Sequence, residues 1–430
     1  MRAHKRIAKL ALAALLLAGT AGCTAGRETE EEREQNVSAH PTSYTQKDVD
    51  PALARSMNAF ALNFYGMLDR EPGEESTGPN RMVSPAGIAI ALSMLKAGAR
   101  GDSDRELDKV LKLNGLSGEA LDSAQLVMRE MLRGYDPSIR MDIANSIWSR
   151  EGFALKPDYV NTLQKDYGAR AEALDFDSAR AAETMNAWAA ENTAGKIEQV
   201  IAAPIDPDAV LFLMNAMYFK GSWTQPFEAE QTQDLPFTTA AGEETTVPTM
   251  AQQGEYDYLD AEGFQAIRLP YGESGNFGMV LALPDEDSSL DAFKRKYLPR
   301  FGKWSKQLDD AQGRVELPKF KLEDSLKLND ALIALGMPSV FDASKAELEG
   351  IGEARAGRLY VSKVGHDTFI EVNEEGTEAV AVTSITVEDG AAPGGRPFEL
   401  RLNRPFFFAI TDKTTDLIVF MGEVGSPAEK

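Results

Sequence analysis

Few residues of this chain have the types and spacing that nucleophilic catalysis requires. Ser84, His366 and Asp367 would form the set of a serine hydrolase, in which the histidine activates the serine. The sequence contains no G-x-S-x-G elbow and no His or Cys cluster with metal-ligand spacing. Ser84 precedes a proline at a helix start, where capping is the simpler role, and His366 is better explained as a hydrogen-bonded core histidine. A hydrolase is therefore the least favoured class, and neither a cofactor nor a metal is expected.

Another stretch, residues 371–383, carries a stronger pattern. On one face of an extended chain its residues are all small: Thr377, Ala379, Ala381 and Thr383. The other face is β-branched or charged: Glu378, Val380 and Val382. This pattern suits a strand with one face against a tight core. Residues 388–395, however, have the composition of an exposed loop, so that an edge strand and a long surface loop are the simplest interpretation of these residues alone.

Composition limits the class of protein. The 430 residues are 43% hydrophobic and 26% charged, which is typical of globular chains with one large domain or two smaller ones. A formal charge of −22 argues against nucleic acid as a partner and against electrostatic binding to anionic lipid. No apolar run within residues 44–430 is long enough to span a bilayer.

The N-terminus has the pattern of an export signal, which we assign to residues 1–22. Basic residues precede an apolar run, and small residues then lead to Cys23, the single cysteine. Ala21-Gly22-Cys23 resembles the lipobox of bacterial lipoproteins, whose cysteine is lipidated, although Thr20 stands where that motif prefers leucine. Cleavage by an ordinary signal peptidase is the alternative. We expect an exported protein, extracellular or in the cell envelope, that contacts a membrane only through a lipid on Cys23.

The remaining chain divides into a polar tether, residues 23–50, and one domain, residues 51–430. Apolar spacing predicts helices through 53–68 and 88–95, and at 103–113, 121–132, 157–167, 181–192, 290–297 and 326–335. Strands are predicted at 143–148, 209–218, 266–269, 277–283, 314–321, 369–372, 398–402, 406–411 and 417–424. A helical first half and a strand-rich second half without a linker predict a single α+β domain.

From about residue 58 to 427 the chain resembles the serpin family. The resemblance is carried by blocks in the family's order: Ser84-Pro85, Gly98-Ala99-Arg100-Gly101, Asn186-Ala187-Trp188, Asn215 to Trp223, Val247-Pro248-Thr249-Met250, Leu269-Pro270-Tyr271, Leu317-Pro318-Lys319, Asn403-Arg404-Pro405-Phe406 and Phe420-Met421-Gly422. The resemblance implies a large central mixed β-sheet with further sheets, about eight to nine helices, and an exposed reactive-centre loop at about residues 374–397.

The resemblance also implies a function, suicide inhibition of a serine or cysteine protease by a protein that is not itself an enzyme. After cleavage the hinge side of the loop would insert into the central sheet and distort the acyl-enzyme before deacylation. The hinge would be Glu374, Glu375, Gly376, Thr377, Glu378, Ala379, Val380, Ala381, Val382 and Thr383. Its inward face carries no charge or proline that would block insertion. The alternative is a serpin-fold binding protein that does not inhibit.

Family positions suggest two control points. A shutter beneath the opening strands would contain Ser84, Asn215 and His366, with Gly87 where a second serine is common. A breach, where Glu374 enters the sheet, would contain Trp223 and Lys319, and a pair between Lys319 and Glu374 is expected.

The reactive bond is predicted between Gly390 and Ala391. Counting the usual loop length of the family forward from Gly376 gives this bond, whereas counting back from Asn403 gives Gly394, so the position of the bond stays open within residues 387–396. Small residues at the bond favour an elastase- or subtilisin-like protease as the target. We expect the protein to be a monomer. Arg396 precedes Pro397, which disfavours a trypsin-like target.

Overall fold

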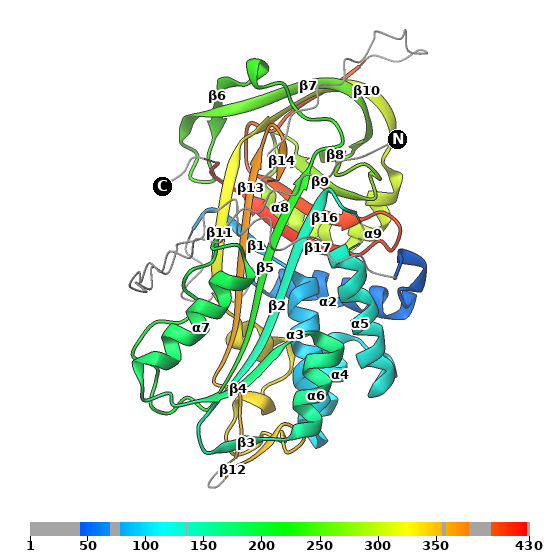
Figure 1. The fold of residues 1–430 in the computed structure, drawn as a ribbon. Coiled ribbons are helices and arrows are strands. Elements are labelled where there is room, and N and C mark those ends of the chain that lie inside the picture. The colour runs from blue at the N-terminus through cyan, green and yellow to red at the C-terminus, as the bar shows by residue number, and fades with distance from the viewer. Residues whose placement is uncertain (1–43, 69–77, 135, 355–357, 378–396, 428–430) are drawn as a thin grey trace, which may run out of the picture. The chain divides into compact units, whose positions relative to one another are not determined.

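The computed structural model describes residues 44–68, 78–134, 136–354, 358–377 and 397–427. Within them the chain forms nine α-helices and three β-sheets (Figure 1). The helices are α2 (Pro51–Leu68), α3 (Pro85–Gly98), α4 (Gly101–Leu111), α5 (Glu119–Gly134), α6 (Pro157–Tyr167), α7 (Ala179–Asn192), α8 (Leu290–Lys296), α9 (Phe301–Trp304) and α10 (Asn329–Leu335). Short 3-10 turns are η1 (Gln46–Asp48), η2 (Ala229–Gln231), η3 (Leu298–Arg300), η4 (Ser305–Gln307) and η5 (Ser339–Phe341).

A six-stranded mixed sheet, called the central sheet below, holds the candidate site. In spatial order its strands are β11 (Phe320–Lys327), β13 (Lys363–Asn373), β14 (Gly376–Thr377), β5 (Leu211–Ser222), β2 (Ile139–Arg150) and β4 (Arg170–Leu174). β13 and β5 run parallel, and the two-residue strand β14 is antiparallel to both.

A nine-stranded sheet packs against the central sheet through the main hydrophobic core. Its path is β1 (Arg81–Val83), β17 (Ile418–Val424), β16 (Phe406–Asp412), β9 (Phe277–Pro284), β8 (Phe264–Pro270), β7 (Glu244–Ala261), β10 (Asp309–Pro318) and β15 (Phe398–Arg401), with β6 (Gln233–Thr238) paired to β7. β3 (Phe153–Leu155) and β12 (Gly352–Ala354) form a separate pair.

Two hydrophobic cores cover opposite faces of β5. Leu213, Met217 and Phe219 belong to the main core, which also includes α2, α3 and the nine-stranded sheet. The alternate residues of β5, among them Met214 and Tyr218, belong to a second core, which includes Trp188 of α7. Because side chains alternate along a strand, a segment entered beside β5 would meet both cores.

The structure corrects several predicted boundaries. The single strand predicted at 314–321 is two strands in different sheets, because the chain leaves β10 at Pro318 and enters β11 at Phe320. β7 was not predicted, since its buried positions do not alternate regularly. Within the last residues of the predicted tether, Gln46 is buried and donates to the Asp412 carboxylate at 2.7 Å.

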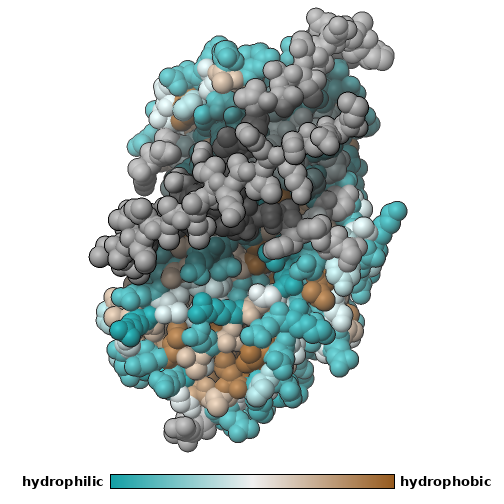
Figure 2. Space-filling model, viewed as in Figure 1, coloured by the Kyte–Doolittle hydropathy of each residue, from teal (hydrophilic) through white to brown (hydrophobic). Residues whose placement is uncertain are grey.

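The surface agrees with the acidic composition. Figure 2 shows hydrophilic residues over much of the coloured surface on this face, with apolar residues gathered in its lower part. Among the described residues, Ile333 is the one large apolar side chain that is exposed, at 40%. No helix within the described ranges combines the length and the hydropathy that a membrane span requires.

Candidate functional site

The described part of the hinge lies between two strands at one end of the central sheet. Thr377 is paired with Gly221 of β5 on one side and with Val372 of β13 on the other. The chain enters this position through two backbone bonds: Trp223 N–H donates to the carbonyl of Glu375 at 3.0 Å, and Phe227 N–H to that of Glu374 at 2.8 Å. The hinge has therefore begun a strand of the sheet.

The pair expected between Lys319 and Glu374 is present. Lys319 Nζ lies 2.8 Å from Glu374 Oε2, and Thr232 donates to Glu374 Oε1 at 2.8 Å. Burial by itself raises the pKa of Glu374, but the hydrogen bonds from Lys319 and Thr232 outweigh it and hold this pKa below its ordinary value. The carboxylate is thus kept ionised at the point where the hinge enters.

An aromatic stack supports the inserted residue. The Trp223 ring lies on the Tyr271 ring, with centroids 4.4 Å apart, and Trp223 Nε1 donates to the carbonyl of Asn373 at 3.0 Å. The Tyr271 hydroxyl lies 2.6 Å from Thr377 Oγ1. Thr377 is fully buried, so its small side chain already occupies the core-facing position that the alternating pattern predicted.

Gly376 is required by this close approach. Its φ is +151°, and a Cβ there would lie 2.2 Å from the carbonyl oxygen of Gly221. The turn before it is closed by the Asn373 side chain, which accepts from the backbone N–H of Glu375 at 3.1 Å and of Gly376 at 3.3 Å.

Farther along the sheet, β13 and β5 pair directly with each other. The register runs from Lys363 opposite Phe212 to Phe369 opposite Tyr218. The sheet therefore contains an inserted strand at one end and a closed seam over the rest, which is the geometry of a sheet that can accept a further strand.

The three predicted shutter residues lie together across this seam. His366 Nε2 accepts from the backbone N–H of Ser84 at 2.8 Å, so its proton is on Nδ1, which donates to Asn215 Oδ1 at 2.8 Å. Burial lowers the pKa of His366 to about 3, and the ring is neutral at physiological pH. The His366–Asn215 bond joins β13 to β5.

Two further residues complete the shutter. Asn215 Nδ2 donates to Asn145 Oδ1 of β2 at 2.8 Å. At Gly87 a Cβ would lie 2.6 Å from Asn215 Oδ1, so Asn215 occupies the space that a serine would need, and the Gly87 amide instead donates to Ser84 Oγ at 3.2 Å.

The geometry does not support a catalytic triad. Ser84 Oγ donates to the carbonyl of Val419 at 2.7 Å, while His366 contacts only the backbone of Ser84. Asp367 accepts from Ser325 at 2.6 Å. In the described ranges, His, Cys, Asp and Glu form no group that could hold a metal ion.

Several predicted residues lie outside the described ranges. They are the hinge residues Glu378, Ala379, Val380, Ala381, Val382 and Thr383, the reactive-bond residues Gly390 and Ala391, and Cys23. In contrast, Thr232, Tyr271 and Asn145 are site residues that the sequence interpretation did not assign. Tyr271 was visible only as part of the Leu269-Pro270-Tyr271 block, and nothing local distinguishes Asn145 or Thr232.

Comparisons with known proteins agree with this geometry. The family model for serpins (serine protease inhibitors) matches residues 55–427. Leukocyte elastase inhibitor of Xenopus tropicalis is 33% identical over 382 residues, which cover 86% of this chain and 100% of the relative. The native-state structure of tengpin, a thermophilic serpin, has a TM-score of 0.80 at 29% identity and covers 91% of this chain and 98% of its own.

Human thyroxine-binding globulin also has this fold, with a TM-score of 0.78 at 23% identity, over 88% of this chain and 100% of its own. The matching family is one of protease inhibitors, not enzymes. With the family model covering residues 55–427 and the central sheet built as described, this chain belongs to the serpin family.

Proposed function

We propose that this chain inhibits a serine or cysteine protease by trapping the acyl-enzyme as the cleaved loop inserts between β13 and β5. One observation carries the proposal: Gly376 and Thr377 already form a strand between β13 and β5, while the same two strands pair directly farther along. Insertion would extend a strand whose first pairs exist.

The register of β14 supports the inward face that the sequence predicts. Each residue added after Thr377 steps back by one along β5, so Ala379 would lie beside Phe219, Ala381 beside Met217, and Val387 beside Leu211, where β5 begins. Phe219 and Met217 are fully buried. Alanine adds little volume beside such residues, so the core can close around it without overpacking.

The outward face would also find a matching surface. In the same register Val380 would lie between Tyr218 and Phe369, which belong to the second core. Glu378 would lie between Lys220 and Glu371, beside one cation and one carboxylate at the end of the sheet.

The shutter would hold the intact protein in its uninserted state. The same register brings Thr383 between Asn215 and His366, so the hydrogen bond between their side chains must break before the strand can pass. The intact fold would thus be kinetically held, and the inserted form would gain the strand pairing and the burial of the hinge.

As target we propose an elastase- or subtilisin-like protease, cleaving between Gly390 and Ala391. The inserted strand would reach Val387 at the end of β5, which leaves the proposed bond just beyond the paired segment. One relative is named for the inhibition of leukocyte elastase, which is a property of that protein and supports the choice of the first protease to test.

The proposal is tested by mixing the intact protein with elastase or with trypsin. We expect an SDS-stable band of higher mass with elastase, and a released C-terminal fragment that begins at Ala391. Cleavage without a stable band would favour the non-inhibitory alternative. A fragment beginning at Pro397, or a stable complex with trypsin and none with elastase, would contradict the proposed bond.

We also propose that the protein is exported and anchored by a lipid on Cys23. The support is the signal pattern of residues 1–22 and the Ala21-Gly22-Cys23 motif. Labelling with a fatty-acid analogue in an exporting host should mark the parent protein but not a Cys23→Ser variant. An unlabelled parent whose N-terminus differs from Cys23 would indicate ordinary signal-peptidase cleavage.

A further inference from the structure

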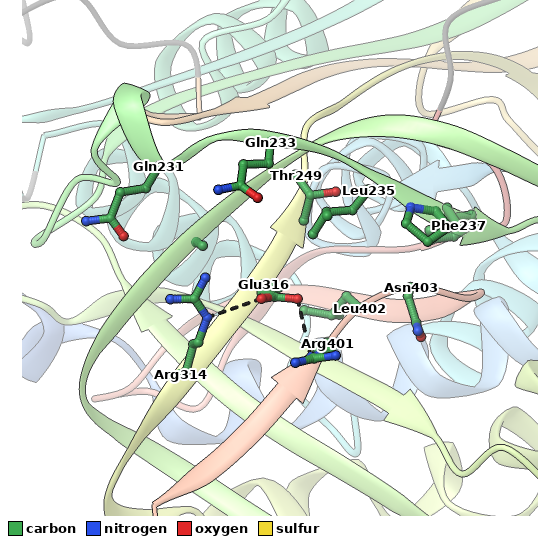
Figure 3. Close-up of a pocket in the computed structure, with 12 residues that line it drawn as sticks. Gln231, Gln233, Leu235, Phe237, Thr249, Arg314, Glu316, Arg401, Leu402 and Asn403 are labelled. Carbon is green, nitrogen blue, oxygen red and sulfur yellow. Dashed lines mark hydrogen bonds and ion pairs between the residues drawn. The ribbon is translucent and has the colours of Figure 1, made fainter.

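A pocket of about 230 Å³ lies beside the breach, on the face of the nine-stranded sheet where β6, β7, β10 and β15 meet (Figure 3). It belongs to neither the hinge nor the shutter. Its apolar part is formed by Leu235, Phe237, Ala251 and Leu402, of which the last three are buried. Its polar part contains Gln233, Arg314, Glu316 and Arg401.

The two arginines of this pocket have different partners. Arg401 is opposite Glu316 in the register of β10 and β15, lies 3.5 Å from it, and also contacts the Glu399 carboxylate. Arg314 contacts Glu316 alone, through Nε at 3.1 Å. The Glu316 carboxylate is thus engaged by both guanidinium groups.

The terminal nitrogens of Arg314 have no hydrogen-bond partner among the described residues, and neither does the Gln233 side-chain amide. In Figure 3, Gln233 and Arg314 face the pocket from opposite sides, with Glu316 on the other edge of the guanidinium. A carboxylate placed between them would accept two parallel N–H bonds from Arg314 and one from Gln233, away from the Glu316 oxygens.

The rest of the pocket limits what such a ligand can carry. Leu235, Phe237 and Leu402 provide an apolar wall beside these donors, and the small volume admits only a short or single-ring body. We propose that this pocket is a binding site for a small monocarboxylate with an apolar body, held by Arg314 and Gln233. Because β6, β10 and β15 all contribute, such a ligand would bridge three strands that are distant in sequence.

The test uses the full chain, without protease, and phenylacetate as the probe. Ligand-observed NMR and calorimetry should detect phenylacetate binding with a Kd on the order of 0.1–1 mM, as expected for a ligand of this size. Phenylacetamide and phenethylammonium, which keep the ring without the carboxylate, should bind about tenfold more weakly or not at all.

Two matched variants locate the site. Arg314→Gln and Arg401→Gln each remove one positive charge beside the Glu316 carboxylate, so their long-range electrostatic effects are alike. Arg314→Gln should weaken phenylacetate binding about tenfold or more, and Arg401→Gln about threefold or less. Ala251→Leu keeps both arginines but fills the pocket, and should abolish binding.

Several outcomes would overturn the proposal. They are the absence of phenylacetate binding by the parent, equal binding of phenylacetamide, a larger loss in Arg401→Gln than in Arg314→Gln, and unchanged binding by a folded Ala251→Leu variant. None of these measurements depends on whether the chain inhibits a protease, so the two proposals fail separately.

Discussion

Tyr271 holds the first buried residue of the hinge through one hydroxyl contact. Its ring is fixed by the stack on Trp223, and its hydroxyl lies 2.6 Å from Thr377 Oγ1. Burial raises the pKa of Tyr271 well above its ordinary value, so the hydroxyl stays protonated and available as a donor.

We therefore expect Tyr271→Phe to loosen the hinge without disturbing the stack. Loss of one neutral hydrogen bond costs about 0.5–1.5 kcal/mol, so amide exchange at Gly376 and Thr377 should accelerate about two- to tenfold. Tyr256→Phe is the control, because that hydroxyl donates to Gln252 at 2.9 Å, away from the hinge. Equal exchange in the parent and in Tyr271→Phe would mean that the hydroxyl contact does not hold Thr377.

Asp324 on β11 is a partly buried carboxyl beside the strand that carries His366. It accepts from the backbone N–H of Met82 at 2.5 Å, and burial raises its pKa to about 6. The folded state therefore binds this proton more tightly than the unfolded chain does. The stability that Asp324 contributes is present below about pH 4 and is lost as the pH rises through about 6.

Asp324→Asn should remove this dependence. The variant should unfold at a higher temperature than the parent at pH 7.5. The difference between their free energies of unfolding should be smaller at pH 4.5, by an amount on the order of 2 kcal/mol. Burial lowers the pKa of His366, so its protonation destabilises the folded state as the pH falls. The variant must therefore be compared with the parent at the same pH. A gap that stays constant between the two pH values would contradict the assignment.

At the scale of elements, the two residues of β14 must be small, whereas the next residue along the chain need not be. Thr377 is fully buried, and Gly376 leaves no room for a Cβ. Glu378, the next residue, would fall on the other face in the same register.

If the chain traps proteases as proposed, Thr377→Arg should convert it from an inhibitor into a substrate. An unpaired arginine in the main core costs several kcal/mol, so insertion slows and deacylation is completed first. The ratio of cleaved to complexed protein on a gel measures this partition. Glu378→Arg, the same substitution one residue on, is the control and should keep the stable complex. If Thr377→Arg forms the complex at the parent's stoichiometry, the inward face is wrongly assigned.

The sequence predicted elements well where apolar spacing was regular. α6 was predicted at its observed bounds, and β9, β16 and β17 to within one residue at each end. It failed at β7, whose eighteen residues serve different neighbours along their length, and at Lys319, where one predicted strand passes between two sheets. Local patterns do not contain such tertiary pairings.

The same division applies to the site. Ser84, Asn215, His366 and Lys319 could be assigned because they lie in family-specific blocks. Asn145 and Thr232 each contribute through one side-chain hydrogen bond, and Tyr271 contributes through its hydroxyl and its stack on Trp223. No spacing rule in the sequence selects such single residues. Only the packed arrangement shows which side chains meet.

At the scale of the whole molecule, the proposed mechanism requires the central sheet to take up a further strand after cleavage. We expect cleavage within residues 387–396 to raise the unfolding temperature by more than about 20 °C, because a full strand and its apolar face become buried. Calorimetry of intact and cleaved protein measures the shift. Equal unfolding temperatures would mean that the strand does not insert, and would contradict trapping.

The two residues of β14 have a kinetic consequence. The costly event in adding a strand is the first correct alignment, and a slip of one residue would direct Glu378 into the core in place of Ala379. With Thr377 aligned on Gly221 before any cleavage, the proposed insertion would begin from a formed nucleus, and only propagation would remain. The rate of insertion relative to the rate of deacylation would then depend on how fast β13 and β5 separate ahead of the advancing strand. No search for the correct register would be needed.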